Sequence, residues 1–137
     1  MLGRVLVVDD DVESCEMLEE GLRLRGFAVH ARQSVDDALR AIGTEGPFDA
    51  VLTDLRMPQR TGLDLLRHVV ATEPALPVIV VTAFGSIDMA VQAVRLGAHD
   101  FITKPFDLDV IAIALERAVQ YRSMRLAIDR LRARTGE

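Results

Sequence analysis

The feature that most constrains the fold is a regular alternation of short apolar runs with segments of helical periodicity. Residues 5–8, 50–52 and 78–81 are continuous apolar runs of strand length. Such runs suit strands buried on both faces, which occur in parallel sheets. Between them, apolar residues recur every three or four positions, as in residues 15–22, and this spacing indicates amphipathic helices. The alternation predicts an α/β fold, a doubly wound five-stranded parallel sheet with flanking helices.

Several boundaries of these elements can be read from capping residues. Ser34 with Asp37 and Thr61 with Asp64 have the spacing of capping boxes, and Ser86 can cap the helix after the fourth strand. We expect the last helix to run from about residue 108 toward 131. The strands are expected at residues 5–8, 27–31, 50–54, 78–82 and 101–103.

The composition indicates one soluble globular domain. The chain has 137 residues, 50% of them hydrophobic and 27% charged, and this length suits a single core. No apolar stretch reaches the ~18 residues of a membrane span, and the first residues do not resemble a signal peptide. Because Cys15 is the only cysteine, an internal disulfide is impossible, and we interpret it as a buried thiol. A cytoplasmic location without membrane contact is therefore expected.

Charge and histidine placement argue against two classes of function. The 16 basic and 21 acidic residues give a net charge of −5, which disfavours nucleic-acid binding through the overall field. His30, His68 and His99 are widely separated and lack ligand spacing, so a transition-metal site is not expected.

Reactive side chains recur at the ends of the predicted strands. They are Asp9 and Asp10 after the first strand, Asp54 at the third, Thr82 at the fourth and Lys104 after the fifth. The strand ends of a parallel sheet share one edge, where doubly wound folds bind their ligands. Each residue alone could be a helix cap or a surface charge. Their joint occurrence at one edge favours a functional site.

Three carboxylates in one crevice indicate a cation site. Their mutual repulsion would raise the pKa of at least one of them unless a cation lies between them. Mg²⁺ fits best, because it prefers oxygen ligands and often binds phosphate as well. Asp54 could then attack phosphorus and form an aspartyl phosphate, with Thr82 and Lys104 binding the phosphoryl group. Asp11 lies furthest along the turn and is interpreted as a helix cap only.

The chain resembles the response-regulator receiver domain of two-component signalling over about residues 3–120. The motifs that carry the resemblance are Val7-Val8-Asp9-Asp10, Asp54 with Met57-Pro58 and Gly62, Thr82-Ala83, and Lys104-Pro105-Phe106. The resemblance implies a flavodoxin-like fold of strand order 2-1-3-4-5 and a histidine kinase that donates the phosphoryl group from a phosphohistidine. It implies a phosphoacceptor signalling domain with slow self-catalysed phosphorylation and dephosphorylation, not an enzyme.

The same resemblance assigns the metal ligands. Asp54 would be the phosphoacceptor and would share Mg²⁺ with Asp10 directly and with Asp9 largely through water. The backbone carbonyl of Arg56 would be a further ligand.

The resemblance also assigns the groups that bind the phosphoryl group and respond to it. Thr82, the backbone N–H of Ala83 and Lys104 would hold the phosphoryl oxygens. The bond between Lys104 and Pro105 would be cis. Phe101 occupies the position of an aromatic switch residue, and because it lacks a hydroxyl, packing would have to drive its inward rotation.

Residues 82–106 are most similar to receivers of sigma-54-dependent transcription activators of the nitrogen and dicarboxylate type. The motifs are Gly85-Ser86-Ile87, Met89-Ala90-Val91 and Gly97-Ala98-His99-Asp100-Phe101. We therefore expect a regulatory domain excised from such a protein, the alternatives being a stand-alone receiver or a phosphorelay protein.

A flavodoxin-like cofactor binder is disfavoured, because no glycine-rich phosphate loop follows the first strand and there is no Trp. A phosphatase is disfavoured because no second acid closely follows Asp54.

The final helix is longer than the receiver domain needs, and its last part has a sequence pattern of its own. We divide the chain into a receiver domain, 1–120, and a helical extension, 121–137, and expect apolar residues of the extension to be exposed on a lone helix. Between residues 117 and 134 the final helix holds six arginines and one acid, Asp129. This excess of arginine fits a solvated flank better than a nucleic-acid site. A homodimer joined through this helix is predicted. The residues with coiled-coil spacing are Val110, Ala114, Arg117, Tyr121, Met124, Ile128 and Leu131, of which Arg117 does not fit an apolar seam. Up to about Val119 the helix is expected to pack on the sheet.

Overall fold

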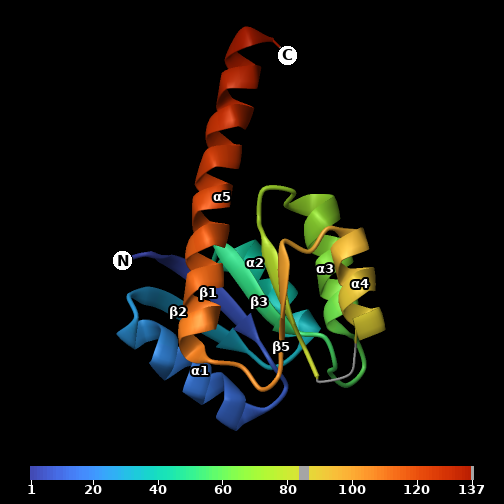
Figure 1. Cartoon of the computed structure of the whole chain (residues 1–137). Helices are drawn as coiled ribbons and strands as arrows, with labels where there is room; N and C mark the ends of the chain where they lie inside the picture. Colours follow the sequence, from blue (N-terminus) through green and yellow to red (C-terminus); the bar gives the residue numbers. More distant parts are fainter. Residues whose placement is uncertain (84–86, 137) are drawn as a thin grey trace.

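A five-stranded parallel sheet lies at the centre of the computed structural model, which describes residues 1–83 and 87–136 (Figure 1). The strand order, β2-β1-β3-β4-β5, confirms the expected topology. The strands are β1 (Gly3–Val8), β2 (Phe27–Arg32), β3 (Ala50–Asp54), β4 (Val78–Thr82) and β5 (Asp100–Thr103). The helices are α1 (Val12–Leu24), α2 (Val35–Thr44), α3 (Gly62–Thr72), α4 (Ile87–Leu96) and α5 (Leu108–Thr135).

Each face of the sheet packs against its own set of helices. Val5 and Val7 of β1 belong to a core shared with α1 and α5. Leu6 and Val8 point to the opposite face and pack in a core shared with α2, α3 and α4. Alternate residues of one strand are thus buried on opposite faces, which explains why the strands are continuously apolar.

Local signals in the sequence define the starts of three helices. Asp11 and Ser34 accept backbone N–H groups as N-caps of α1 and α2, and Asp64 accepts the N–H of Thr61 at 2.9 Å at the start of α3. These contacts confirm the interpretation of Asp11 as a cap. Ser86, the predicted cap of α4, lies outside the described residues.

α3 begins so close to the end of β3 that its first residue must be glycine. A Cβ atom on Gly62 would lie 2.3 Å from the carbonyl oxygen of Asp54 and 2.9 Å from Cα of Leu55. The N–H of Gly62 donates to the carbonyl oxygen of Leu55 at 2.9 Å. Gly62 therefore lets α3 close the loop that follows Asp54.

α5 continues well past the sheet as a projecting helix (Figure 1). Its contacts with the rest of the domain extend beyond residue 120. The ring of Tyr121 lies 5.0 Å from that of His99, centroid to centroid, and the guanidinium of Arg122 lies 3.7 Å from the carboxylate of Asp49. The expectation that Tyr121 is exposed on a lone helix is wrong, because the turn before β5 offers it a ring to pack against.

Further along α5, Met124 and Leu131 are exposed as expected, whereas Ile128 is not. Met124 is 57% exposed and Leu131 is 60% exposed, and Ile128 between them is partly buried. None of the helices in the described part of the chain combines the length and hydrophobicity of a membrane span.

The contact at Gly62 predicts a position that cannot accept even a methyl group. Gly62→Ala should lower the free energy of unfolding by about 1–3 kcal/mol, since the neighbouring atoms are backbone and cannot rotate away. Gly43→Ala is the matched control, because nothing lies within 4 Å of its Cβ position in α2. That change should stabilise the helix by about 0.5–1 kcal/mol. Urea unfolding of both variants measures the two effects, and a Gly62→Ala protein as stable as wild type would contradict this packing.

Candidate functional site

Three carboxylates meet at the carboxyl edge of the sheet. β1 and β3 are neighbours whose register pairs Val8 with Thr53, so the residues that follow, Asp9 and Asp54, emerge side by side. Oxygens of Asp9, Asp10 and Asp54 lie within 4.8 Å of one another. The structure therefore brings together the three acids that the sequence placed at this edge.

Lys104, which directly follows the edge strand β5, also reaches this cluster. Its Nζ lies 2.9 Å from Oδ2 of Asp54, and the Asp54 side chain is only 11% exposed. Burial alone would lower the pKa of Lys104, but the hydrogen bond to Asp54 and the nearby carboxylates outweigh it, and the pKa is raised. The lysine is therefore held as a cation beside the predicted nucleophile.

Asp9 is the most buried acid of the cluster. Burial is the main cause that raises its pKa, and the charge of Asp54 raises it further, whereas the N–H of Asp11, which donates to Asp9 at 3.0 Å, lowers it. A carboxylate in this position favours a nearby cation, because the cation would offset both the burial and the repulsion. A hard cation with oxygen ligands fits this set of donors.

Thr82 ends β4 next to this cluster and has an unused hydroxyl. The residue is 2% exposed, and among the described residues its Oγ1 is the buried side-chain oxygen without a hydrogen-bond partner. The carbonyl of Thr82 accepts the N–H of Lys104 at 2.8 Å, which links the two strand ends. Since buried polar groups are normally paired, this hydroxyl is available for a ligand.

The backbone next to Asp54, Thr82 and Lys104 has three features that bear on the site. The N–H of Arg56 donates to Oδ1 of Asp54 at 3.2 Å, so the loop after β3 folds back over the carboxylate. Ala83 directly follows Thr82 and is exposed. The peptide bond between Lys104 and Pro105 is cis, as the resemblance implied.

The predicted switch residue Phe101 lies in the outward position. It is 44% exposed and lines an apolar cleft of about 420 Å³ between α4 and β5. Thr82 and Ala83 line the same cleft. A movement of Thr82 at the end of β4 would therefore change the shape of the cleft that Phe101 also lines.

Sequence reasoning missed one contact that supports the acidic loop. Cys15 is buried, as expected, and its Sγ donates to the backbone carbonyl of Asp9 at 3.2 Å. Burial raises the pKa of this thiol to about 11, so the thiol form that donates the bond persists at neutral pH. The helical spacing predicted that Cys15 is buried, but not that α1 would turn it toward that carbonyl.

Comparison with known proteins identifies relatives over nearly the whole chain. The family model for the response regulator receiver domain matches residues 5–116. Regulatory protein AtoC of Escherichia coli is 38% identical over 130 residues, which are 95% of this chain and 28% of AtoC. The DNA-binding transcriptional regulator NtrC of Proteus hauseri is 40% identical over 124 residues, 90% of this chain and 26% of NtrC.

Solved structures agree with the sequence relatives. NtrX from Brucella abortus in complex with ADP matches with a TM-score of 0.89 and 33% identity, covering 96% of this chain and 30% of that one. The receiver domain of the same NtrX matches with a TM-score of 0.80 and 36% identity, covering 85% of this chain and 98% of that one. This chain thus spans less than a third of the two curated relatives. It belongs to the response regulator receiver domain family.

Proposed function

We propose that this receiver accepts a phosphoryl group from a sensor histidine kinase onto Asp54 in a Mg²⁺-dependent reaction. The observation that carries the proposal is one edge of the sheet where a carboxylate, two further acids and a lysine converge beside a buried unpaired hydroxyl. Family membership favours this chemistry over the other uses of a doubly wound sheet.

The acid cluster would hold the metal. Asp10 and Asp54 would bind Mg²⁺ directly, Asp9 largely through water, and the carbonyl of Arg56 would add an uncharged ligand. When bound, the ion supplies positive charge that offsets the carboxylates and the phosphoryl oxygens. The close approach of the three carboxylates and the raised pKa of Asp9 support this assignment.

The transfer step requires little from the protein except position and charge. An oxygen of Asp54 attacks phosphorus while the bond between phosphorus and the donor histidine nitrogen breaks, and the nitrogen keeps the electron pair. Lys104 already contacts Asp54, so it can follow the new negative charge onto the phosphoryl oxygens. The hydroxyl of Thr82 and the N–H of Ala83 would donate to the same oxygens.

Signalling would follow from these new contacts. A phosphoryl group adds roughly −1.5 to −2 charges, and the donors on β4 and β5 would move toward it. Because Thr82 and Phe101 line one cleft, this movement would let Phe101 repack inward and change the surface of α4 and β5. The phosphoryl group shifts the equilibrium only as far as it binds the two conformations differently.

The relatives support a role in transcription. Two of them are named a regulatory protein and a DNA-binding transcriptional regulator, and the motifs of residues 82–106 resemble receivers of sigma-54-dependent activators. We infer a cytoplasmic protein in which this receiver controls an attached effector of that type. The segment itself would not contact nucleic acid.

Dimerisation through α5 is the second part of the proposal. Met124, Ile128 and Leu131 form an apolar stripe at heptad spacing on the projecting part of the helix. Tyr121 is already packed on His99, so the seam would start one turn later than the sequence pattern suggested. Pairing with a second copy would remove the stripe from water.

Phosphorylation of Asp54 is the first prediction that follows from this proposed function. Incubation with acetyl phosphate and Mg²⁺ should add the mass of one phosphoryl group, and EDTA should prevent it. Asp54→Asn should lose the reaction completely, whereas Asp88→Asn, a change on the exposed side of α4, should react as wild type does. Intact mass spectrometry measures all four samples. Labelling of Asp54→Asn at the wild-type level would exclude Asp54 as the acceptor.

The second prediction separates acquisition of the phosphoryl group from the response to it. Thr82→Val keeps the shape of the side chain and removes a hydroxyl that has no partner. The unphosphorylated variant should therefore unfold at the same or a slightly higher urea concentration than wild type. It should still be phosphorylated, but the NMR shifts of Phe101 and α4 should respond weakly. Thr82→Ser should restore the response, and a full response in Thr82→Val would refute the coupling.

The third prediction concerns the helix seam. Met124→Gln combined with Leu131→Gln removes the exposed apolar side chains from the seam and leaves the helix intact. Sedimentation should show a dimer for the wild-type chain and a monomer for this variant, measured with and without acetyl phosphate. Ala127→Gln with Ala133→Gln, at exposed positions off the seam, is the matched control and should remain dimeric. A monomeric wild-type chain under both conditions would refute the seam.

A further inference from the structure

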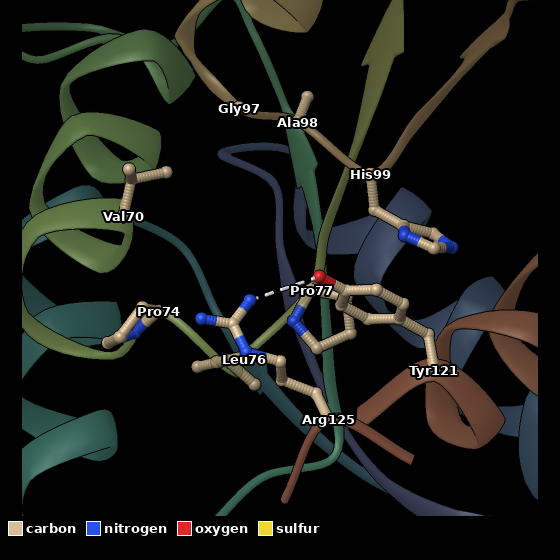
Figure 2. A pocket seen from close by; sticks show the side chains of 9 residues that line it. All are labelled: Val70, Pro74, Leu76, Pro77, Gly97, Ala98, His99, Tyr121 and Arg125. Atoms are coloured by element: carbon tan, nitrogen blue, oxygen red, sulfur yellow. Dashed lines mark hydrogen bonds between the residues drawn. The ribbon is translucent and has the colours of Figure 1, made fainter. Parts of the chain in front are cut away.

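A second cleft lies at the amino edge of the sheet, opposite the acid cluster. It measures about 440 Å³. Its walls come from the end of α3 and the turn into β4, from the turn between α4 and β5, and from α5 (Figure 2). None of the groups assigned to phosphoryl transfer lines it. The residues are Val70, Pro74, Leu76, Pro77, Gly97, Ala98, His99, Tyr121 and Arg125.

The lining combines an apolar body with a few polar groups at one side. Val70, Leu76 and the two prolines supply aliphatic surface, and Figure 2 shows the Tyr121 hydroxyl and the Arg125 guanidinium meeting in front of Leu76 and Pro77. Binding sites for small molecules likewise combine apolar surface with a small number of placed polar groups. The volume falls in the lower part of the range of about 300–1,000 Å³ for such sites.

Arg125 retains hydrogen-bonding capacity toward the cleft. Its Nη1 donates to the Tyr121 hydroxyl at 3.4 Å and its Nε donates to Asp129 at 3.4 Å. Both distances are long for such bonds, and a guanidinium has five N–H donors. Asp129 does not line the cleft, and among the described residues that do, none is acidic.

The cleft favours a carboxylate, because the ion pair of Arg125 with Asp129 is long, 3.4 Å, and Asp129 lies outside the lining. A guanidinium presents two parallel N–H groups that match the two oxygens of a carboxylate. The tilted pair of Tyr121 and His99, with ring centroids 5.0 Å apart, gives a flat aromatic or branched group a surface to pack on. A protein partner would need a contact of about 800 Å² on each side, whereas this cleft is a local hollow with three walls.

We propose that this cleft binds a small organic carboxylate with a compact apolar body, and that Arg125 recognises the carboxylate. The ligand would touch the α4–β5 turn and α5 at the same time, joining two parts that otherwise meet here through the rings of His99 and Tyr121. The proposal does not depend on phosphorylation, because no residue of the cleft belongs to the acid cluster.

The test uses benzoate as the probe and benzamide as its uncharged counterpart. Both are titrated into the full 137-residue chain while amide NMR shifts are recorded. Benzoate should shift the amides of Gly97, Ala98 and His99, and benzamide should bind about tenfold more weakly or worse, since it lacks the charge. The same titration on Asp54→Asn should give an unchanged benzoate affinity, which separates this site from the proposed phosphoacceptor.

Substitution of the arginine completes the test. Arg125→Met keeps an unbranched stem for packing and removes the guanidinium, and it should lower benzoate affinity about tenfold or more. Arg130→Met, at an exposed position of the same helix, is the matched control and should bind as wild type does. If Arg125→Met perturbs folding, Arg125→Lys serves instead. It keeps the positive charge but not the two parallel N–H groups, and it should lower benzoate affinity by an intermediate amount.

Three results would overturn the proposal. The first is equal binding of benzoate and benzamide, and the second is benzoate binding that Arg125→Met leaves intact. The third is measured on the Met124→Gln Leu131→Gln variant, in which the helix seam is removed: cleft resonances that still change on dilution without any probe would show that a second copy of the chain occupies the cleft.

Discussion

The ion pair between Asp54 and Lys104 is the interaction on which the site depends. Three carboxylates at one edge repel one another, and Lys104 places a cation 2.9 Å from Oδ2 of Asp54. A cation that contacts Asp54 also stands ready for the charge that a phosphoryl group would bring. The pair joins strands that are not neighbours, since β4 lies between β3 and β5. A change in this contact can therefore move the ends of β3 and β5, which flank the end of β4 where Thr82 lies.

The parallel sheet made this edge predictable from the sequence. Asp9, Asp54 and Thr82 are far apart along the chain, but each follows or ends an apolar run, and parallel strands end at a common edge. The strand order was less accessible, because strand lengths and spacing fit several orders, and it came from the family resemblance alone. The unpaired state of the Thr82 hydroxyl depends on the packing around it, which no local pattern encodes.

Other features could not be predicted because they depend on contacts between remote segments. The helical pattern gave the apolar face of α5, and a seam drawn from spacing alone included Tyr121. The ring of Tyr121 instead packs on His99, at the turn before β5, and Arg122 approaches Asp49 at the start of β3. A side chain with an apolar body and a polar tip can lie either in a helix seam or against the rest of the domain. Its periodicity in the sequence therefore does not decide between the two.

These contacts give α5 a different role from that of a helix that merely covers the sheet. Its first half packs on β3 and β4 and against α1, and residues 121–125 join it to the turn between α4 and β5. That turn connects the α4 surface, which the phosphoryl group would reorganise, to the projecting part of α5, where pairing would occur. A signal from Asp54 would therefore not need to cross the core to reach the helix, since β4, α4 and this turn are contiguous along the chain. An occupant of the amino-edge cleft would contact the same turn, and it would act on α5 at the point where the helix leaves the domain.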